Sequence, residues 1–228
     1  MKPAAPGARA TRRPAPARVS ASTAPHEVRI IGGQWRRSRL PVADAPGLRP
    51  TPDRVRETLF NWLGQDLAGW RCLDAFAGSG ALGFEAASRG AARVLLVEHD
   101  RRLAEGLRRV KARLHAEAVE VLCASALDVM QGLAPDSLDL LFLDPPFGQG
   151  LRMPGLQAAA RVVTPGGWVY VEDEQPLAEC PAPWVVHRQG RAGMVHHHLL
   201  RRLPLPASPQ DRLDTLNTEA SRRGDVGG

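Results

Sequence analysis

The sequence of 228 residues has little of what stabilises secreted or membrane-bound proteins. Its only cysteines are Cys72, Cys123 and Cys180, which lie far apart and form no CxxC pair. This spacing excludes a disulfide framework and a cysteine-based zinc site, so we expect three reduced cysteines in the core. No run of about 18 apolar residues exists, and no segment is expected to span a membrane. These absences predict a cytoplasmic protein.

Acidic residues are nearly missing from the front of the chain. Residues 1–50 hold 10 Lys and Arg against 2 Asp and Glu, whereas residues 51–228 hold 20 against 22. The net charge of +6 therefore comes from the N-terminal part alone. A basic front end on a nearly neutral body favours a polyanionic partner such as nucleic acid. Composition leaves open the alternative of a solvated arginine-rich leader without function.

The sequence pattern divides the whole chain into four expected regions. Residues 1–26 contain no acid and five prolines, so we expect a disordered basic leader. Residues 27–50 resemble a basic β-hairpin, with Gly32 and Gly33 at the turn and three arginines on the second limb, namely Arg36, Arg37 and Arg39. Residues 51–203 form the expected main domain, and residues 204–228 a flexible tail.

A helix is predicted over residues 51–63. Thr51 has the side chain of an N-cap, Pro52 suits the first helical position, and Asp53 places negative charge in the first turn. Val55, Leu59 and Leu63 then recur at helical spacing, which predicts one apolar face.

From residue 71 onward, apolar strand-like runs alternate with helical patterns. The expected strands are 71–76, 93–98, 119–124, 138–144 and 168–174, and the expected helices are 81–90, 100–115, 127–133 and 156–163. This alternation predicts an α/β fold with a mostly parallel sheet covered on both faces. Residues 184–189 and 194–203 lack an intervening helix, which indicates an antiparallel hairpin at the sheet edge.

Two polar runs in the last expected strands are interpreted as structural rather than functional. Strand alternation separates His197 from its neighbours His196 and His198, and no third ligand is near, so we expect a surface strand and no metal. Residues 172–174 (Glu-Asp-Glu) are interpreted as a solvated strand end, with a place near the functional site as the alternative.

A glycine loop follows the first strand of the sheet. Gly78, Gly80 and Gly83 form GxGxxG, and Glu98 ends the next strand 20 residues after Gly78. This pattern indicates an adenosine-type cofactor whose ribose Glu98 would bind, and by itself it fits NAD as well as S-adenosylmethionine. Asp74 lies in the turn before the glycines, where it would repel a pyrophosphate and suit an ammonium group.

The stretch LLFLDPPFGQG (residues 140–150) ends a core strand abruptly. Asp144 is followed by Pro145 and Pro146, which stiffen the backbone, and by the aromatic ring of Phe147. Because ligands bind at the carboxyl ends of parallel strands, this loop should face the reactive end of the cofactor. A hydride-transfer enzyme has no evident use for such a loop, so the pair of motifs favours S-adenosylmethionine.

FAGSGALG and LDPPF together resemble class I methyltransferases that modify exocyclic nitrogens of bases. With VRIIGGQWRR and PGLRPTPDRVRETLFNWL ahead of them, residues 27–203 resemble the bacterial 16S ribosomal RNA guanine-N2 methyltransferase family. The resemblance implies a seven-stranded Rossmann-like fold, S-adenosylmethionine as methyl donor without a metal, and a guanine of 16S rRNA in a 30S particle as acceptor. We expect a monomer.

The resemblance also implies site residues. The cofactor would contact Asp74, Phe76, Gly78, Ser79, Gly80 and Glu98, and the catalytic loop would be Asp144, Pro145, Pro146 and Phe147. Many relatives have Asp or Asn after the third strand to bind the adenine; here Ser125 is the nearest match. Arg36, Arg37 and Arg39 are the expected RNA-binding residues.

The catalytic loop suits an exocyclic amine. The Asp144 carboxylate and the Pro145 carbonyl could accept its two N–H groups, while Phe147 stacks on the base. An unperturbed aspartate is a weak base, so we expect orientation to outweigh proton abstraction. The alternatives are an adenine-N6 DNA methyltransferase, for which the chain lacks room for a target-recognition insertion, and a nucleic-acid-binding protein without catalytic activity.

Overall fold

The computed structural model describes residues 27–43, 51–146, 148–177 and 180–204. The predicted leader (1–26), nearly all of the predicted tail and Phe147 lie outside the described residues. In the described part of the chain, no helix has the length and apolar character needed to cross a membrane.

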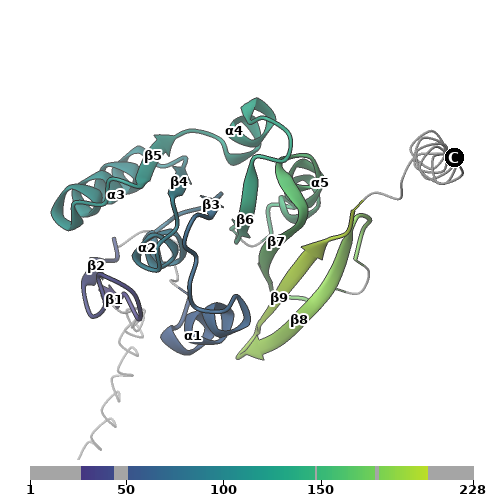
Figure 1. The fold of residues 1–228 in the computed structure, drawn as a ribbon, viewed down its shortest axis with the longest axis horizontal. Coiled ribbons are helices and arrows are strands. Elements are labelled where there is room, and N and C mark those ends of the chain that lie inside the picture. Colours follow the sequence, from purple (N-terminus) through teal and green to yellow (C-terminus); the bar gives the residue numbers. More distant parts are fainter. Residues whose placement is uncertain (1–26, 44–50, 147, 178–179, 205–228) are drawn as a thin grey trace, which may run out of the picture.

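The main domain is the predicted α/β fold, with helices on both faces of a twisted sheet (Figure 1). Its strands are β3 (Arg71–Asp74), β4 (Arg93–Glu98), β5 (Val119–Cys123), β6 (Leu138–Leu143), β7 (Val163–Asp173), β8 (Trp184–Ala192) and β9 (Val195–Arg202). In the order β5-β4-β3-β6-β7-β9-β8, the first five are parallel and the last two form the predicted antiparallel hairpin. The predicted seven-stranded sheet is therefore confirmed within the described residues.

The sheet separates the hydrophobic core into two layers, and helices cover each of them. They are α1 (Asp53–Trp62), α2 (Ala81–Ser88), α3 (Arg101–Leu114), α4 (Ala126–Gly132) and α5 (Arg152–Val162). One buried cluster joins α1, α2 and α3 to one sheet face through residues such as Phe60, Phe84 and Phe142. The other joins α4 and α5 to the opposite face through residues such as Met130, Leu141 and Leu156. Alternate residues of each central strand therefore enter different layers, as expected for a sheet covered on both faces.

The start of α1 differs from the prediction. Pro52 occupies the N-cap position and no side chain caps the helix, although Val55 and Leu59 are buried as expected. The Thr51 side chain is buried and donates a hydrogen bond to Glu172 Oε1 across 2.9 Å instead. Thr51 lost its predicted capping role because a tertiary partner competes for its hydroxyl.

The N-terminal hairpin is wider than predicted. Strands β1 (Glu27–Arg29) and β2 (Arg39–Pro41) pair antiparallel, but a loop over residues 30–38 joins them. Gly32 and Gly33 do not make a tight turn, because this loop packs against the end of α2. Gly33 has φ +72°, and an added Cβ would lie 1.7 Å from the Ser88 carbonyl oxygen. The glycines are therefore needed for close approach rather than for reversal of the chain.

Several polar side chains are placed differently from the expectation. Cys72 is buried as predicted, whereas Cys123 is exposed at the end of β5. His197 and His198 are buried rather than on a surface strand, because β9 lies between β7 and β8. Glu172 is also buried, so its interpretation as a solvated strand end is wrong.

Candidate active site

Carboxylates gather at the carboxyl edge of the sheet. Asp74 ends β3, Glu98 ends β4, Asp144 follows β6, and Glu172 is the last residue but one of β7. Since β4, β3, β6 and β7 are consecutive neighbours, these four residues form one row, which we call the acidic edge. The chain order reverses between β3 and β6, and open α/β sheets bind ligands at such a switch point.

The glycine loop is fastened to this edge by its own carboxylates. Gly78 N donates to Glu98 Oε2 across 2.9 Å, and Gly83 N donates to Asp74 Oδ2 across 3.0 Å. Gly80 has φ +76°, and an added Cβ would lie 2.6 Å from the ring of Phe84. Glycine is therefore required there both for its backbone conformation and for space. The structure brings Asp74, Gly78, Gly80 and Glu98 together as the sequence predicted.

A cavity of about 220 Å³ opens beside the glycine loop. Its walls come from the loops after β3, β4, β5 and β6, and they include Phe76, Glu98, Ser125 and Pro146. The Ser125 hydroxyl also accepts a hydrogen bond from Asp128 N at the start of α4, across 3.4 Å. Four predicted cofactor residues do not line this cavity, namely Asp74, Gly78, Ser79 and Gly80. Of these, Asp74, Ser79 and Gly80 are buried.

A second, more polar cavity of about 160 Å³ lies beyond the loop that contains Pro145 and Pro146, which we call the Pro-Pro loop. Pro145 and Glu172 line it, and Pro146 and Leu151 line both cavities. The residues after Asp144 therefore separate a pocket beside the glycine loop from a pocket beside β7. Two ligands placed in these pockets would meet at the Pro-Pro loop.

Burial and mutual repulsion weaken the acidity of the acidic edge. Burial, then the neighbouring Glu172 and Asp74 carboxylates, raise the pKa of Asp144 well above its usual value. Burial, with a contribution from Glu98, raises the pKa of Asp74 to about 7, although the hydrogen bond from Gly83 opposes this shift. An aspartate with a raised pKa accepts a proton more readily. Asp144 is thus a better base than the ordinary aspartate that the sequence suggested.

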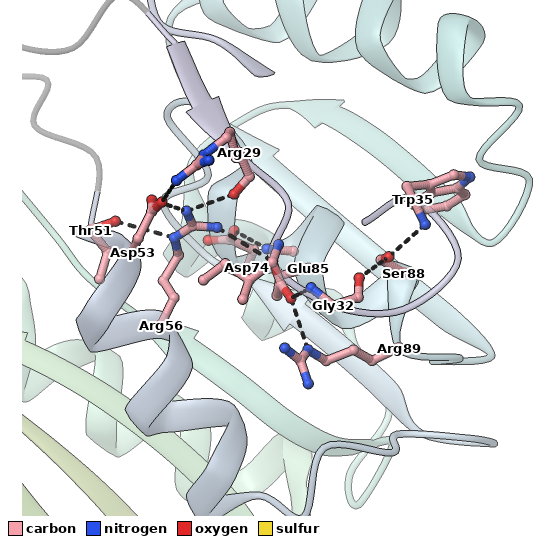
Figure 2. Close-up of polar contacts among 12 residues, drawn as sticks. Arg29, Gly32, Trp35, Thr51, Asp53, Arg56, Asp74, Glu85, Ser88 and Arg89 are labelled. Carbon is pink, nitrogen blue, oxygen red and sulfur yellow. Dashed lines mark hydrogen bonds and ion pairs between the residues drawn. The ribbon is translucent and has the colours of Figure 1, made fainter. Parts of the chain in front are cut away.

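The loop of the N-terminal hairpin is fixed to α2 by a buried carboxylate outside the acidic edge, that of Glu85 (Figure 2). Glu85 accepts hydrogen bonds from Ile31 N and Gly32 N across 2.7 and 2.8 Å. It also forms ion pairs with Arg56 (3.4 Å) and Arg89 (2.9 Å). We call Arg56, Glu85 and Arg89 the arginine-neutralised cluster.

The predicted RNA-binding arginines lie on this anchored hairpin. Arg36, Arg37 and Arg39 are all exposed. Arg39 forms an exposed ion pair with Glu27 across 2.8 Å, whereas Arg36 and Arg37 have no ion pair among the described residues. The hairpin thus presents cationic side chains on a support that is attached to the glycine-loop helix.

A place near the site was expected for Glu172 only as the alternative, and no sequence signal placed Thr51 or Tyr170 there. Tyr170 OH donates to Glu172 Oε1 across 2.8 Å, beside the bond from Thr51. A signal was available: Asp144 and Glu172 both follow apolar strand runs, and parallel strands end at one edge. What the sequence could not supply is that β6 and β7 are neighbours, with Leu143 opposite Val171.

Comparisons with known proteins found similar sequences and structures. The family described as conserved hypothetical protein 95 matches residues 28–201. The ribosomal RNA small subunit methyltransferase D of Escherichia coli (strain K12) is 45% identical over 185 residues, which are 77% of this chain and 90% of the relative. The protein of the same name from Haemophilus influenzae is 40% identical over 80% of this chain and 97% of its own length. Among solved structures, yhhF from Escherichia coli has 40% identity and a TM-score of 0.71 and covers 78% of this chain and 98% of that chain.

Proposed function

The chain belongs to the family of the ribosomal RNA small subunit methyltransferases D, matched as conserved hypothetical protein 95, and we propose that it methylates the exocyclic N2 of a guanine in 16S rRNA. The methyl donor is S-adenosylmethionine. One observation carries the proposal: two cavities meet at the Pro-Pro loop that follows Asp144. One would hold the donor and the other the base.

The residues around the first cavity suit a cationic donor. Buried carboxylates of the acidic edge attract the positive charges of a sulfonium and an ammonium group, whereas they would repel the pyrophosphate of NAD. Glu98 is held by Gly78 N and, across 2.8 Å, by Asp100 N, so its carboxylate is fixed toward the cavity and keeps lone pairs for ribose hydroxyls. Phe76 supplies an apolar wall, and Ser125 is the side chain for the adenine end.

When bound, S-adenosylmethionine supplies an activated methyl group. The chain's own residues prepare the acceptor. The Asp144 carboxylate and the Pro145 carbonyl accept the two N–H groups of N2 and direct the nitrogen lone pair toward the donor cavity. The raised pKa of Asp144 then favours its taking up the proton that the methylated nitrogen releases. Phe147 would complete the loop as a stacking surface.

The RNA partner is engaged by the anchored hairpin. Arg36, Arg37 and Arg39 contact phosphates and orient the RNA relative to the site without touching the donor. The guanine must be unpaired or flipped to reach the Pro-Pro loop. The protein works as a monomer on a small-subunit particle in the cytoplasm.

The test is transfer of labelled methyl groups to small subunits from cells that lack this enzyme. Naked 16S rRNA and duplex DNA serve as comparison substrates, and the labelled nucleoside is identified after digestion. We expect N2-methylguanosine from the RNA substrates. Label in N6-methyladenine of the DNA, or no label on any substrate, would refute the proposal.

A further inference from the structure

Glu172 is a buried carboxylate of which one oxygen is firmly held. The residue is 6% exposed, and its Oε1 accepts hydrogen bonds from Thr51 Oγ1 (2.9 Å) and Tyr170 OH (2.8 Å). Thr51 precedes α1 and Tyr170 lies on β7, so two elements fix the side chain. Two hydroxyl donors on a single oxygen also stabilise the carboxylate form against burial, which raises the pKa of Glu172.

The other oxygen is available to a ligand in the second cavity, which Glu172 lines. Among the described residues, none donates a hydrogen bond to Glu172 Oε2, yet Glu172 lines the cavity together with Pro145 and Pro146. Leu143 is opposite Val171 in the β6/β7 ladder, so Asp144 and Glu172 stand at the next register position and on the same sheet face. A base whose amine is held by Asp144 would therefore present its neighbouring edge atom to Glu172.

We propose that Glu172 selects guanine by accepting a hydrogen bond from N1–H of the base through Oε2. The inference rests on the proposed function and adds a specificity-determining residue to it. Asp144 and Pro145 would hold the amine, and Glu172 would verify the atom beside it.

The chemistry of the base edge supports this division of labour. Guanine carries a donor at N1 next to the N2 amine, whereas adenine carries an acceptor at N1 next to its N6 amine. A carboxylate is acceptor-only, so it rewards the N1–H of guanine and repels the N1 lone pair of adenine. Once a base covers Oε2, leaving this oxygen unpaired would also be costly, since it would lose its solvation without compensation.

Glu172→Gln tests the idea without removing the support of the side chain. The amide oxygen can still accept from Thr51 and Tyr170, so the Nε2 donor is placed where Oε2 was. The discriminating substrate contains 2-aminopurine, which keeps the exocyclic N2 amine but has a bare N1 acceptor. The nucleotide labelled by the wild-type protein is mapped first. Small-subunit RNA with guanine or 2-aminopurine at that position is then assembled by ligation and reconstituted into subunits.

We expect the wild-type protein to methylate guanine faster than 2-aminopurine by roughly 10²-fold or more, as for sites built around one substrate hydrogen bond. In Glu172→Gln this ratio should fall by at least about tenfold, because the rate on guanine drops and that on 2-aminopurine rises. The fluorescence of 2-aminopurine, recorded with S-adenosylhomocysteine and without turnover, should change more on binding the variant than on binding the wild type.

A merely structural Glu172 would slow both substrates equally, and an unchanged ratio in Glu172→Gln would overturn the inference. Glu117→Gln is the matched control: it makes the same substitution at an exposed carboxylate that lines neither cavity, and should leave the ratio at its wild-type value. Failure of the wild-type protein to label N2 of guanine would refute the proposed function itself, which this ratio does not test.

Discussion

Two buried acidic regions of this protein are built in opposite ways. Glu85 has a fully buried side chain, and arginines bind it from two sides, with Arg56 itself fully buried and Arg89 also stacked 4.6 Å from the ring centroid of Phe60. The acidic edge (Asp74, Glu98, Asp144, Glu172) has no Arg or Lys ion pair among the described residues. Backbone amides hold Asp74 and Glu98 instead, and hydroxyls hold Glu172.

This difference distinguishes an acidic region that supports the fold from one that can bind a ligand. The buried Glu85 carboxylate is already neutralised by arginines, so it holds the hairpin to α2 and is not available to a ligand. Burial, and then repulsion between carboxylates that have no cationic partner, raises the pKa of Asp74 and of Asp144, so both groups tend to keep protons. Such a site is unfavourable when empty and becomes favourable when a cation enters. The acidic edge is thus prepared for a positively charged ligand, and the arginine-neutralised cluster is not.

The largest effect should come from removing the carboxylate of the arginine-neutralised cluster. Glu85→Ala would remove the carboxylate partner of the buried Arg89, leave Arg56 paired with Asp53 alone, and free Ile31 N and Gly32 N. We therefore expect the free energy of unfolding to fall by about 3–5 kcal/mol. Urea denaturation measures this change. Glu120→Ala is the control, because its ion pair with Arg93 is exposed and should contribute less than about 1 kcal/mol. Equal losses in the two variants would contradict the comparison.

Replacing a carboxylate of the acidic edge by alanine should leave the stability of the fold unchanged and strongly reduce catalysis. Asp144→Ala removes a carboxylate that its neighbours repel, so the free energy of unfolding should not fall. Turnover should drop by roughly 10²-fold or more, as on loss of one preorganised electrostatic contact. Single-turnover methylation and calorimetry with the donor are the measurements. Asp139→Ala, at the opposite end of β6 and paired with Arg71, should keep normal turnover. Near-normal methylation by Asp144→Ala would show that the Pro-Pro loop is only structural.

A third prediction concerns protons released when the donor binds. Because the pKa of Asp74 is raised to about 7, its protonated form favours the empty folded state, and this contribution to stability is lost as the pH rises through about 7. A cationic donor prefers the carboxylate. Donor affinity should therefore increase about tenfold between pH 5.5 and pH 7 if one proton is released. Titration calorimetry measures it. Asp74→Asn should flatten this dependence, and an unchanged slope in that variant would exclude Asp74 as the titrating group.

The smallest effect is expected on the surface of the anchored hairpin. Replacing Arg36 and Arg37 by alanine should weaken RNA binding modestly and reduce the slope of log affinity against log salt by about 0.7–0.9 for each lost phosphate contact. Binding to small subunits at several salt concentrations provides the slope. Arg93→Ala, an exposed arginine at the start of β4, is the control and should leave it unchanged. Equal slopes in all three proteins would remove the hairpin from the RNA interface.

The sequence alone was sufficient for the local parts of this protein. The alternation of apolar runs predicted the sheet and the helices, because side-chain periodicity reports which residues can be buried. The spacing of Gly78, Gly80 and Glu98 predicted the glycine loop and its contact with Glu98, since the backbone conformation and close packing of this loop depend on a few neighbouring residues. Asp144 and its prolines were found for the same reason, as a strand that ends abruptly carries its signal locally.

Tertiary structure decided the rest. The hydroxyl of Thr51 could cap a helix or bind a distant carboxylate, and only the packing of α1 against β7 selected Glu172 as its partner. His197, Glu85 and Glu172 have side chains typical of a surface, yet their burial depends on which strands and loops become neighbours. Periodicity assigns a residue to a face of its own strand but contains no information on the strand beside it. The partners of buried charges are therefore fixed by contacts between residues far apart in the chain, such as Thr51 and Glu172.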